Sequence, residues 1–179
     1  MNEPAATTAP VLPVHPLRAS LRWLILLALM LAGCRADQAS KEWARKDLQG
    51  RPMAVVAPVL EFRYAENRAI AFSMFHSLPD NLRVPLIFTL TSVALVALFS
   101  MIWSMRHAGI WKLVPLALIL AGAMGNLLDR LTHGFVVDFV HVHWRDAWSF
   151  PIFNVADSLI TVGATLMIAL FVFRPEPKA

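Results

Sequence analysis

The sequence predicts an all-α membrane protein, in which a bundle of four transmembrane helices carries a small β platform on its extracytoplasmic side. Of the 179 residues, 58% are hydrophobic and only 16% are charged, a composition far more apolar than that of an average soluble domain. The apolar residues gather in four runs, and about 20 such residues are enough to cross a hydrocarbon core of roughly 30 Å. The runs occupy approximately residues 21–36, 84–103, 111–128 and 155–173. Together they predict a single membrane domain over residues 21–173.

Two short tails flank this predicted domain. Residues 1–20 are rich in Pro, Ala and Thr without a helical period, which is typical of a disordered tail, and residues 174–179 form the second tail. Basic residues precede the first run, separate the second from the third, and follow the fourth: Arg18, Arg22, Arg106, Lys112, Arg174 and Lys178. By the positive-inside rule, both termini and the short connection between the second and third runs are cytoplasmic. The connections 35–83 and 129–151 then lie outside.

The longer of these outer connections contains a strand pattern. Leu60, Phe62 and Tyr64 alternate with Glu61 and Arg63, the period of two expected of a half-buried strand or hairpin. We therefore expect the small β platform here.

Small residues mark one face of the third run. Ala117, Ala121 and Gly125 recur at intervals of four, a spacing that lets a neighbouring helix approach closely. This pattern indicates helix packing rather than a ligand site.

Charge and cysteine content exclude several functions. The net charge is +4, but the basic residues form no stripe, which argues against nucleic-acid binding. Cys34 is the only cysteine, so the chain can form neither an intrachain disulfide nor a cysteine-based metal site.

Polar residues at the outer ends of the third and fourth runs need a protein partner. Asn126, Asp129 and Arg130 close the third run, and Asn154 and Asp157 open the fourth. Such side chains are costly at membrane depth, so they usually face a protein interior or a wet cavity.

A polar stripe continues along the fourth run. Asn154 is followed at helical spacing by Asp157 or Ser158, then by Thr161 and Thr165, which predicts one inward polar face for this helix. Asp157 is thus expected to point into the bundle.

A third carboxylate, Asp138, follows in an apolar stretch between the two helix ends. Asp129 is adjacent to Arg130, which favours a structural role for it through ion pairing. Asp138 and Asp157 have no neighbouring cation in sequence, and two such carboxylates brought together could not both ionise cheaply. One carboxyl would then keep a proton while the other stays charged. This arrangement suits the hydrolysis of a peptide bond by water.

These residues belong to an ordered set of motifs. GNLLDR begins at Gly125, GFVVDF at Gly134 and FNVADS at Phe153; upstream lie an Asp-Gln-x-x-Lys element with Asp37 and Lys41 and an Asn-x-x-x-Ala-Phe-Ser element over residues 67–73. In its order and four-run layout, the set resembles the signature of the lipoprotein signal peptidase (signal peptidase II) family across residues 21–173.

The resemblance implies an aspartic endopeptidase of the bacterial inner membrane. Its substrate would be a prolipoprotein already carrying diacylglycerol, cut on the amino side of the lipid-modified cysteine. Asp138 and Asp157 would be the catalytic pair. The same resemblance implies site-ordering or substrate-binding roles for Asn67, Asn126, Arg130 and Asn154, and structural support by Asp37, Lys41 and Asp129.

One position departs from the family pattern. The usual glycine of the Asn67 element is Ala69 here, preceded by Arg68. If this position requires a positive φ, alanine would be strained there. The departure bears on the conformation of this loop and leaves the acids in place.

Two local patterns offer other interpretations. Leu31–Cys34 reads as a lipobox after a basic and apolar segment, although three further apolar runs argue against a lipid-anchored soluble domain and favour an ordinary helix end. His141 and His143 would share a strand face, as in a metal site, but the sequence supplies no third ligand at fixed spacing, which favours interfacial histidines beside Trp144 and Trp148.

Two other classes of function are alternatives to the protease. A proton-coupled transporter would use Asp138 and Asp157 as relays, but the sequence has no evident inverted repeat. A noncatalytic scaffold would use the polar cluster only for packing. The peptidase interpretation implies that membrane lipid and the lipid-modified substrate are the partners. It also implies no metal or organic cofactor and a monomeric protein.

Overall fold

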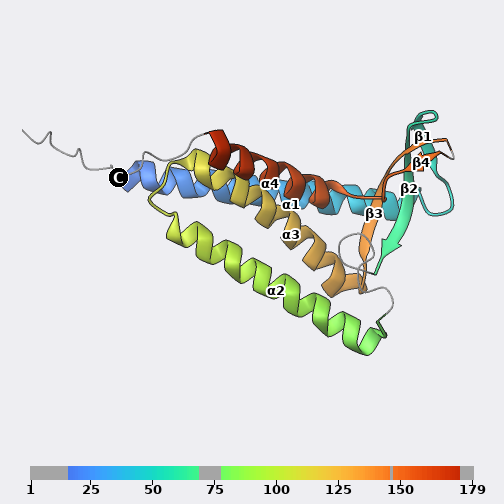
Figure 1. Cartoon of the computed structure of the whole chain (residues 1–179), viewed down its shortest axis with the longest axis horizontal. Helices are drawn as coiled ribbons and strands as arrows, with labels where there is room; N and C mark the ends of the chain where they lie inside the picture. Colours follow the sequence, from blue (N-terminus) through green and yellow to red (C-terminus); the bar gives the residue numbers. More distant parts are fainter. Residues whose placement is uncertain (1–15, 69–77, 146, 174–179) are drawn as a thin grey trace, which may run out of the picture.

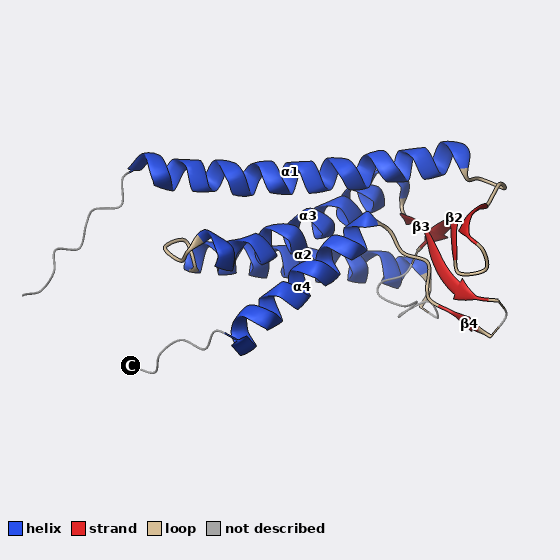
Figure 2. Ribbon diagram, turned by 90° about the horizontal axis from the view of Figure 1, so that it is seen from above, coloured by secondary structure: helices blue, strands red, loops and turns tan. Residues whose placement is uncertain are grey.

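The computed structural model describes residues 16–68, 78–145 and 147–173. Within them, helices gather into a bundle and an antiparallel sheet lies at one end of it (Figures 1 and 2). In chain order the elements are α1 (Pro16–Asp47), β1 (Met53–Val56), β2 (Leu60–Asn67), α2 (Asp80–Ser104), α3 (Ile110–His133), β3 (Val136–Trp144), β4 (Trp148–Ser149) and α4 (Val155–Phe173).

The helices contain the four predicted apolar runs, and α1 differs most from its run. It begins at Pro16 and continues to Asp47, well past the end of the run at residue 36. The added turns are polar but rich in good helix formers, and Arg45 and Lys46 in the last turn complement the helix dipole. Predicted tail residues 16–20 thus belong to α1, whereas 1–15 and 174–179 lie outside the described residues.

α3 packs closely against both α1 and α4, and glycines permit the approach. A Cβ atom added to Gly125 would lie 2.4 Å from Asp37 Oδ2, and one added to Gly122 would lie 2.3 Å from the Ala156 carbonyl oxygen. Contacts this short exclude any side chain at either position. The packing role predicted for the small-residue face of α3 is confirmed, and the same face brings Asp37 to the half of α3 that is nearer the sheet.

The sheet has the order β1-β2-β3-β4, with antiparallel neighbours. The predicted strand or hairpin is confirmed as β1 and β2. Beneath the sheet, the rings of Trp43, Phe62 and Phe139 meet edge to face at 5.5–6.0 Å, an arrangement favoured by aromatic quadrupoles. This cluster joins β2 and β3 to the carboxyl-terminal end of α1 and so sets the position of β3.

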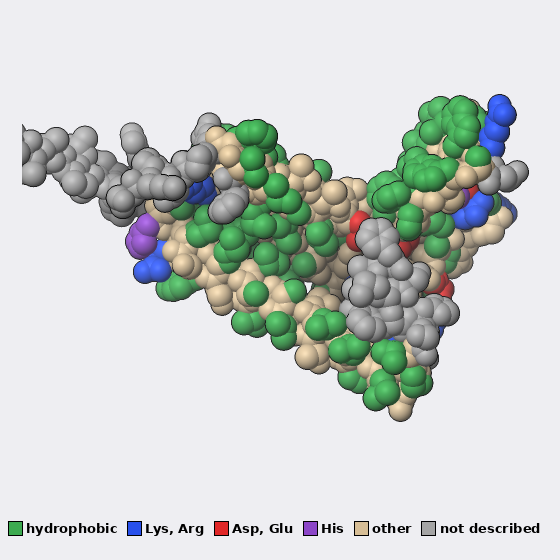
Figure 3. All heavy atoms as spheres, in the orientation of Figure 1, with side chains coloured by type: hydrophobic (Ala, Val, Ile, Leu, Met, Phe, Trp, Pro, Cys, Tyr) green, Lys and Arg blue, Asp and Glu red, His purple; other side chains and the backbone are tan. Residues whose placement is uncertain are grey.

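The surface of the bundle is that of a membrane protein. Among the described residues, Asn81–Ser104 and Ile110–His133 are long and apolar enough to cross a bilayer, with mean hydropathies of 2.2 and 1.6. Along α2, Val93, Val96 and Phe99 are each more than half exposed, and apolar side chains dominate the bundle surface in Figure 3. So large an apolar surface is rare on soluble monomers.

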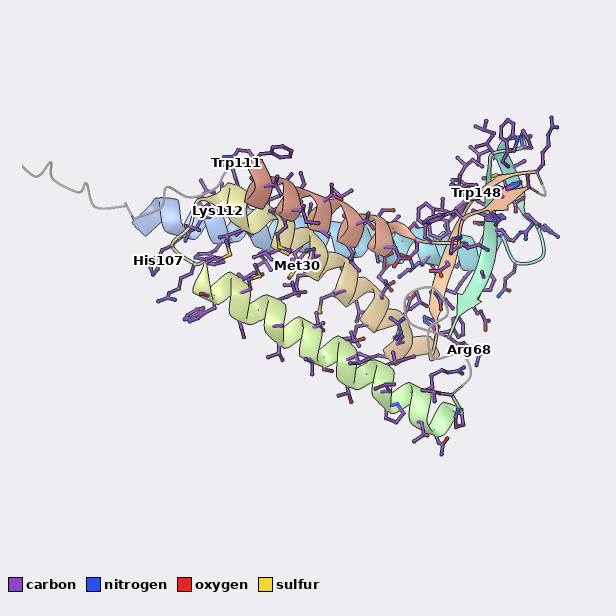
Figure 4. All side chains as sticks on the ribbon, in the orientation of Figure 1. Met30, Arg68, His107, Trp111, Lys112 and Trp148 are labelled. Carbon is purple, nitrogen blue, oxygen red and sulfur yellow. The ribbon has the colours of Figure 1, made fainter. Side chains whose placement is uncertain are left out.

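Aromatic and basic side chains mark the two ends of the bundle. In Figure 4, His107, Trp111 and Lys112 lie at the end remote from the sheet, and Trp148 lies on the sheet. Trp111 and Trp148 are both exposed, as expected for aromatic belts at two membrane interfaces.

Candidate active site

Asp138 lies in β3 with both carboxylate oxygens hydrogen-bonded to amides. Asn154 Nδ2 donates to Oδ1 at 2.7 Å, and Asn67 Nδ2 donates to Oδ2 at 2.9 Å. The side chain is buried. Asn67 ends β2, the strand paired with β3, so strand register brings it to Asp138 across 71 residues of sequence.

Asp157 lies in the first turn of α4, where Asn154 precedes the helix. The Asp157 amide donates to Asn154 Oδ1 at 2.9 Å, and the Asn154 amide donates to Asp157 Oδ2 at 3.2 Å. This reciprocal pair is a capping box, in which a residue before the helix and the third helical residue satisfy each other's free N–H groups. The Asn-x-x-Asp spacing therefore has a local structural cause.

Asn154 joins the two acids. Its backbone and Oδ1 bond to Asp157, whereas its Nδ2 reaches Asp138 Oδ1 and, at 3.3 Å, Asn126 Oδ1. Asn126 Nδ2 in turn donates to Asp157 Oδ1 at 2.9 Å. Two asparagines thus hold the carboxylates of Asp138 and Asp157 in one network built from α3, β3 and α4.

A buried ion cluster supports this network. Lys41 Nζ lies 2.8 Å from Asp37 Oδ2 and 3.2 Å from Asp129 Oδ2, and all three side chains are 1% exposed or less. The same ammonium donates to Asn126 Oδ1 at 2.9 Å. The charges of α1 are therefore coupled to the amide that contacts Asp157.

The two acids of the ion cluster also bind backbone N–H groups. Asp37 Oδ1 accepts from Ala156 N at 2.8 Å, and Asp129 Oδ2 accepts from Val137 N at 2.9 Å. They connect α1 and α3 to the residues immediately before Asp157 and Asp138. Asp129 thus forms an ion pair with Lys41 of another helix.

Arg130 completes the polar cluster. Its Nη1 donates to the Asn126 carbonyl at 3.2 Å, and its guanidinium lies within electrostatic range of Asp157, Asp138 and Asp129. The structure thus brings all nine predicted site residues into one region where α1, α3, β3 and α4 meet.

Burial sets the protonation of Asp138. Loss of solvent raises its pKa from 3.8 to about 7, with the hydrogen bond from Asn67 opposing this rise and the charge of Asp157 adding to it. A carboxyl with this pKa carries a proton about half of the time at neutral pH. The group can therefore donate a hydrogen bond that an ordinary aspartate could not.

Sequence patterns missed some participants and misplaced others. Gln38 donates to Asp129 Oδ1 and to the Gly125 carbonyl, both at 3.1 Å, although only its place in the Asp-Gln-x-x-Lys element pointed to it. The predicted inward stripe of α4 is wrong beyond its first turn, because Thr161 and Thr165 are exposed. Thr165 Oγ1 donates to the Thr161 carbonyl, so its hydroxyl needs no interior partner.

Two further expectations concern α1 and the loop after β2. Cys34 is inside the continuous helix α1, not at a helix end, and its lipobox-like neighbours are helical. Ala69 lies outside the described residues.

The fold is shared with membrane enzymes of known structure. Two solved structures described as bacterial membrane enzymes superpose with TM-scores of 0.70 and 0.68, at 25% and 24% sequence identity. The alignments cover 84% and 87% of this chain and 94% of each solved chain. The fold is therefore of the class found in these membrane enzymes.

Sequence comparison gives the family. A family model described as signal peptidase (SPase) II matches residues 26–173. The chain is 41% identical over 162 residues to the lipoprotein signal peptidase of Pseudomonas fluorescens, covering 89% of this chain and 90% of the relative. It is 38% identical over 149 residues to that of Shewanella loihica, covering 83% and 84%. The chain belongs to the signal peptidase II family, and it is therefore a protease.

Proposed function

We propose that this protein is an aspartic endopeptidase that removes signal peptides from diacylglyceryl-modified prolipoproteins by cutting on the amino side of the lipid-modified cysteine. The network that joins Asp138 to Asp157 through Asn154 carries the catalytic assignment. Asn154 bonds to both Asp138 and Asp157, and the pKa of Asp138 is raised to about 7. Two carboxyls in one network, one of them able to hold a proton at neutral pH, support hydrolysis by an activated water.

In the proposed reaction, Asp157 is the base and Asp138 the acid. Asp138 is assigned the proton because burial raises its pKa to about 7, which leaves Asp157 as the carboxylate that accepts a proton from water. Asp157 removes a proton from water as the water oxygen attacks the scissile carbonyl carbon. Protonated Asp138 donates a hydrogen bond to the carbonyl oxygen and stabilises the tetrahedral intermediate. As this intermediate collapses to the new carboxyl group, the C–N bond breaks and the proton held by Asp157 passes to the leaving amine, while Asp138 keeps its proton.

The remaining polar residues keep these two groups in place. Asn67, Asn126 and Asn154 orient the carboxyls, Arg130 adds positive charge near the developing oxyanion, and the cluster of Asp37, Lys41 and Asp129 braces the helices beneath them. The reaction needs no metal or organic cofactor because the carboxyl pair itself activates water.

The location of the acids fits a substrate that remains in the membrane. Asp138 in β3 and Asp157 in the first turn of α4 lie where the bundle meets the sheet. The end that carries Lys112 and His107 is remote from the sheet (Figure 4). We place the remote end and both termini in the cytoplasm, the sheet at the outer face of the inner membrane, and α1–α4 across the bilayer as one monomeric domain over residues 21–173. The substrate's acyl chains can then stay in lipid while its peptide reaches the acids.

Cleavage of a defined substrate tests the proposed function. Purified protein in detergent should cleave a signal-peptide substrate whose cysteine carries diacylglycerol, and mass spectrometry should find that cysteine at the new amino terminus. The same peptide without the lipid is the matched control, and it should remain intact. Equal cleavage of both peptides would contradict the lipid requirement, and no cleavage where a known signal peptidase II succeeds would contradict the function.

The pH dependence of cleavage tests the role of Asp138. Because the acid must hold a proton, kcat/KM should fall as the pH rises through about 7. Asn67 donates a hydrogen bond to the ionised carboxylate of Asp138 and lowers its pKa. Asn67→Ala should therefore move the alkaline limb of the kcat/KM profile, where activity falls with rising pH, to higher pH by up to about one unit. Asn81→Ala, an exposed change in α2, is the control. A limb that stays in place or moves to lower pH would show that Asp138 is not the titrating acid.

A further inference from the structure

Two histidines and a glutamate form a second polar cluster on the sheet. His141 and His143 are two residues apart in β3, so they share a strand face, and their rings stack with centroids 4.8 Å apart. Glu61 of β2 is the register partner of His141, and its Oε1 lies 2.9 Å from His141 Nδ1. Strand pairing thus brings Glu61 to the two histidines as a third ligand, which their spacing in the sequence does not reveal.

From this geometry we infer that Glu61, His141 and His143 form a binding site for zinc or a similar divalent transition metal. One ligand atom from each residue lies within 4.8 Å of the others. Around a tetrahedral zinc ion, with bonds of about 2.1 Å, ligand atoms stand roughly 3.4 Å apart. Side-chain rotation alone can close this difference. Two imidazoles and a carboxylate suit zinc, whereas magnesium and calcium prefer oxygen ligands alone.

A fourth residue already orients one of the ligands. Ser149 Oγ of β4 lies 2.8 Å from His141 Nε2, and the Nδ1 atom faces Glu61. A hydrogen bond to the far ring nitrogen is the usual way in which proteins fix the tautomer and orientation of a metal-bound histidine. The metal would take the place of the proton between His141 Nδ1 and Glu61 Oε1, and it would join β2 to β3 beside β4.

One cation competes with the metal. Arg63 Nη2 lies 2.8 Å from Glu61 Oε1, the same oxygen that faces His141. The Arg63 side chain is half exposed, so it can turn to solvent when a metal binds. The competing Arg63 guanidinium predicts a moderate affinity of the site for the metal, and removing that side chain should strengthen metal binding.

The site is separate from the catalytic pair. His141 is three positions after Asp138 in β3, roughly 10 Å along a strand, and alternation directs their side chains to opposite faces. A metal here would stabilise the platform without entering the reaction. Removal of the metal should therefore lower the melting temperature of the protein and leave the chemistry of Asp138 and Asp157 in place.

Metal binding by the full chain tests the inference. Tag-free protein in detergent, stripped with a chelator, should bind one zinc ion per chain in equilibrium dialysis, and Co²⁺ should give the visible absorption of a tetrahedral site. His141→Ala, His143→Ala and Glu61→Gln should each weaken binding by about tenfold or more, and Ser149→Ala by about tenfold. Arg63→Gln should tighten it.

A matched histidine outside the cluster controls for adventitious binding. His133→Ala removes an exposed histidine at the end of α3 and should leave zinc binding unchanged. Circular dichroism and gel filtration identify variants that fail to fold, and the folded Arg63→Gln variant tests the site without deleting a ligand. Wild-type protein that binds no more zinc than a folded His141→Ala/His143→Ala double variant would overturn the inference.

Discussion

Asp138→Asn and Asp157→Asn are each expected to lower the rate of prolipoprotein cleavage on the order of 10²- to 10⁴-fold, the usual contribution of a positioned acid or base. Asparagine has nearly the shape of aspartate, but it can neither accept a proton from water nor donate one to a carbonyl oxygen. The loss should appear in kcat rather than in KM, because the side chains act on the reacting atoms. Single-turnover cleavage of the lipid-modified substrate measures it directly.

The controls separate catalysis from folding. Asp47→Asn makes the same change at an exposed position at the end of α1 and should keep wild-type activity. Asp157 also closes the capping box of α4, so Asp157→Asn must show a wild-type helical spectrum before its activity is interpreted. A folded Asp157→Asn variant with normal cleavage would remove the catalytic assignment and favour a noncatalytic scaffold.

Lys41→Met is expected to destabilise the protein by about 3–5 kcal/mol. Lys41, Asp37 and Asp129 are almost completely buried, so removing the ammonium leaves two buried carboxylates of like charge without the cation that lies between them. Asn126 Oδ1 also loses a donor. Equilibrium unfolding in mixed micelles should show the lower stability, and cleavage should fall with it because Asn126 contacts Asp157.

An exposed lysine of the same helix provides the comparison. Lys46 pairs with Glu42 at the surface, where such pairs contribute about 0–1 kcal/mol, so Lys46→Met should have little effect. Neutralising the whole cluster with Asp37→Asn/Lys41→Met/Asp129→Asn should recover part of the stability lost in Lys41→Met, because no charge is then left without a partner. Equal stabilities of the Lys41→Met and Lys46→Met variants would show that removing Lys41 from the cluster does not lower the free energy of unfolding as expected.

The four helices, the strand at Leu60 and the packing face of α3 followed from sequence because each depends on local periodicity. An apolar run of membrane length or an alternation of two is visible within a single segment. The same locality explains an error. Residues 37–47 lack an apolar run, so hydropathy ended the first element at residue 36, whereas helix propensity and the packing of Trp43 on the sheet continue α1 to Asp47.

Sequence motifs identify the candidate acids, whereas only the structure shows which residues form hydrogen bonds and ion pairs with them. Asp129 forms an ion pair with Lys41, 88 residues earlier in the chain, and no pattern around Asp129 in the sequence points to that lysine. Likewise, Asn67 reaches Asp138 only because β2 and β3 are in register. Contacts of this kind depend on how separate elements pack, which single-segment patterns do not contain.

By itself, the sequence determined the membrane character of this protein, the order of its elements and the identity of the residues most able to do chemistry, because composition, period and motif are properties of the chain. Tertiary structure alone decided that Asp138 is buried with a pKa of about 7, that Asn154 connects it to Asp157, and that Glu61 stands opposite His141. Burial and strand register arise only when distant segments meet, and they set the electrostatic environment in which each side chain acts.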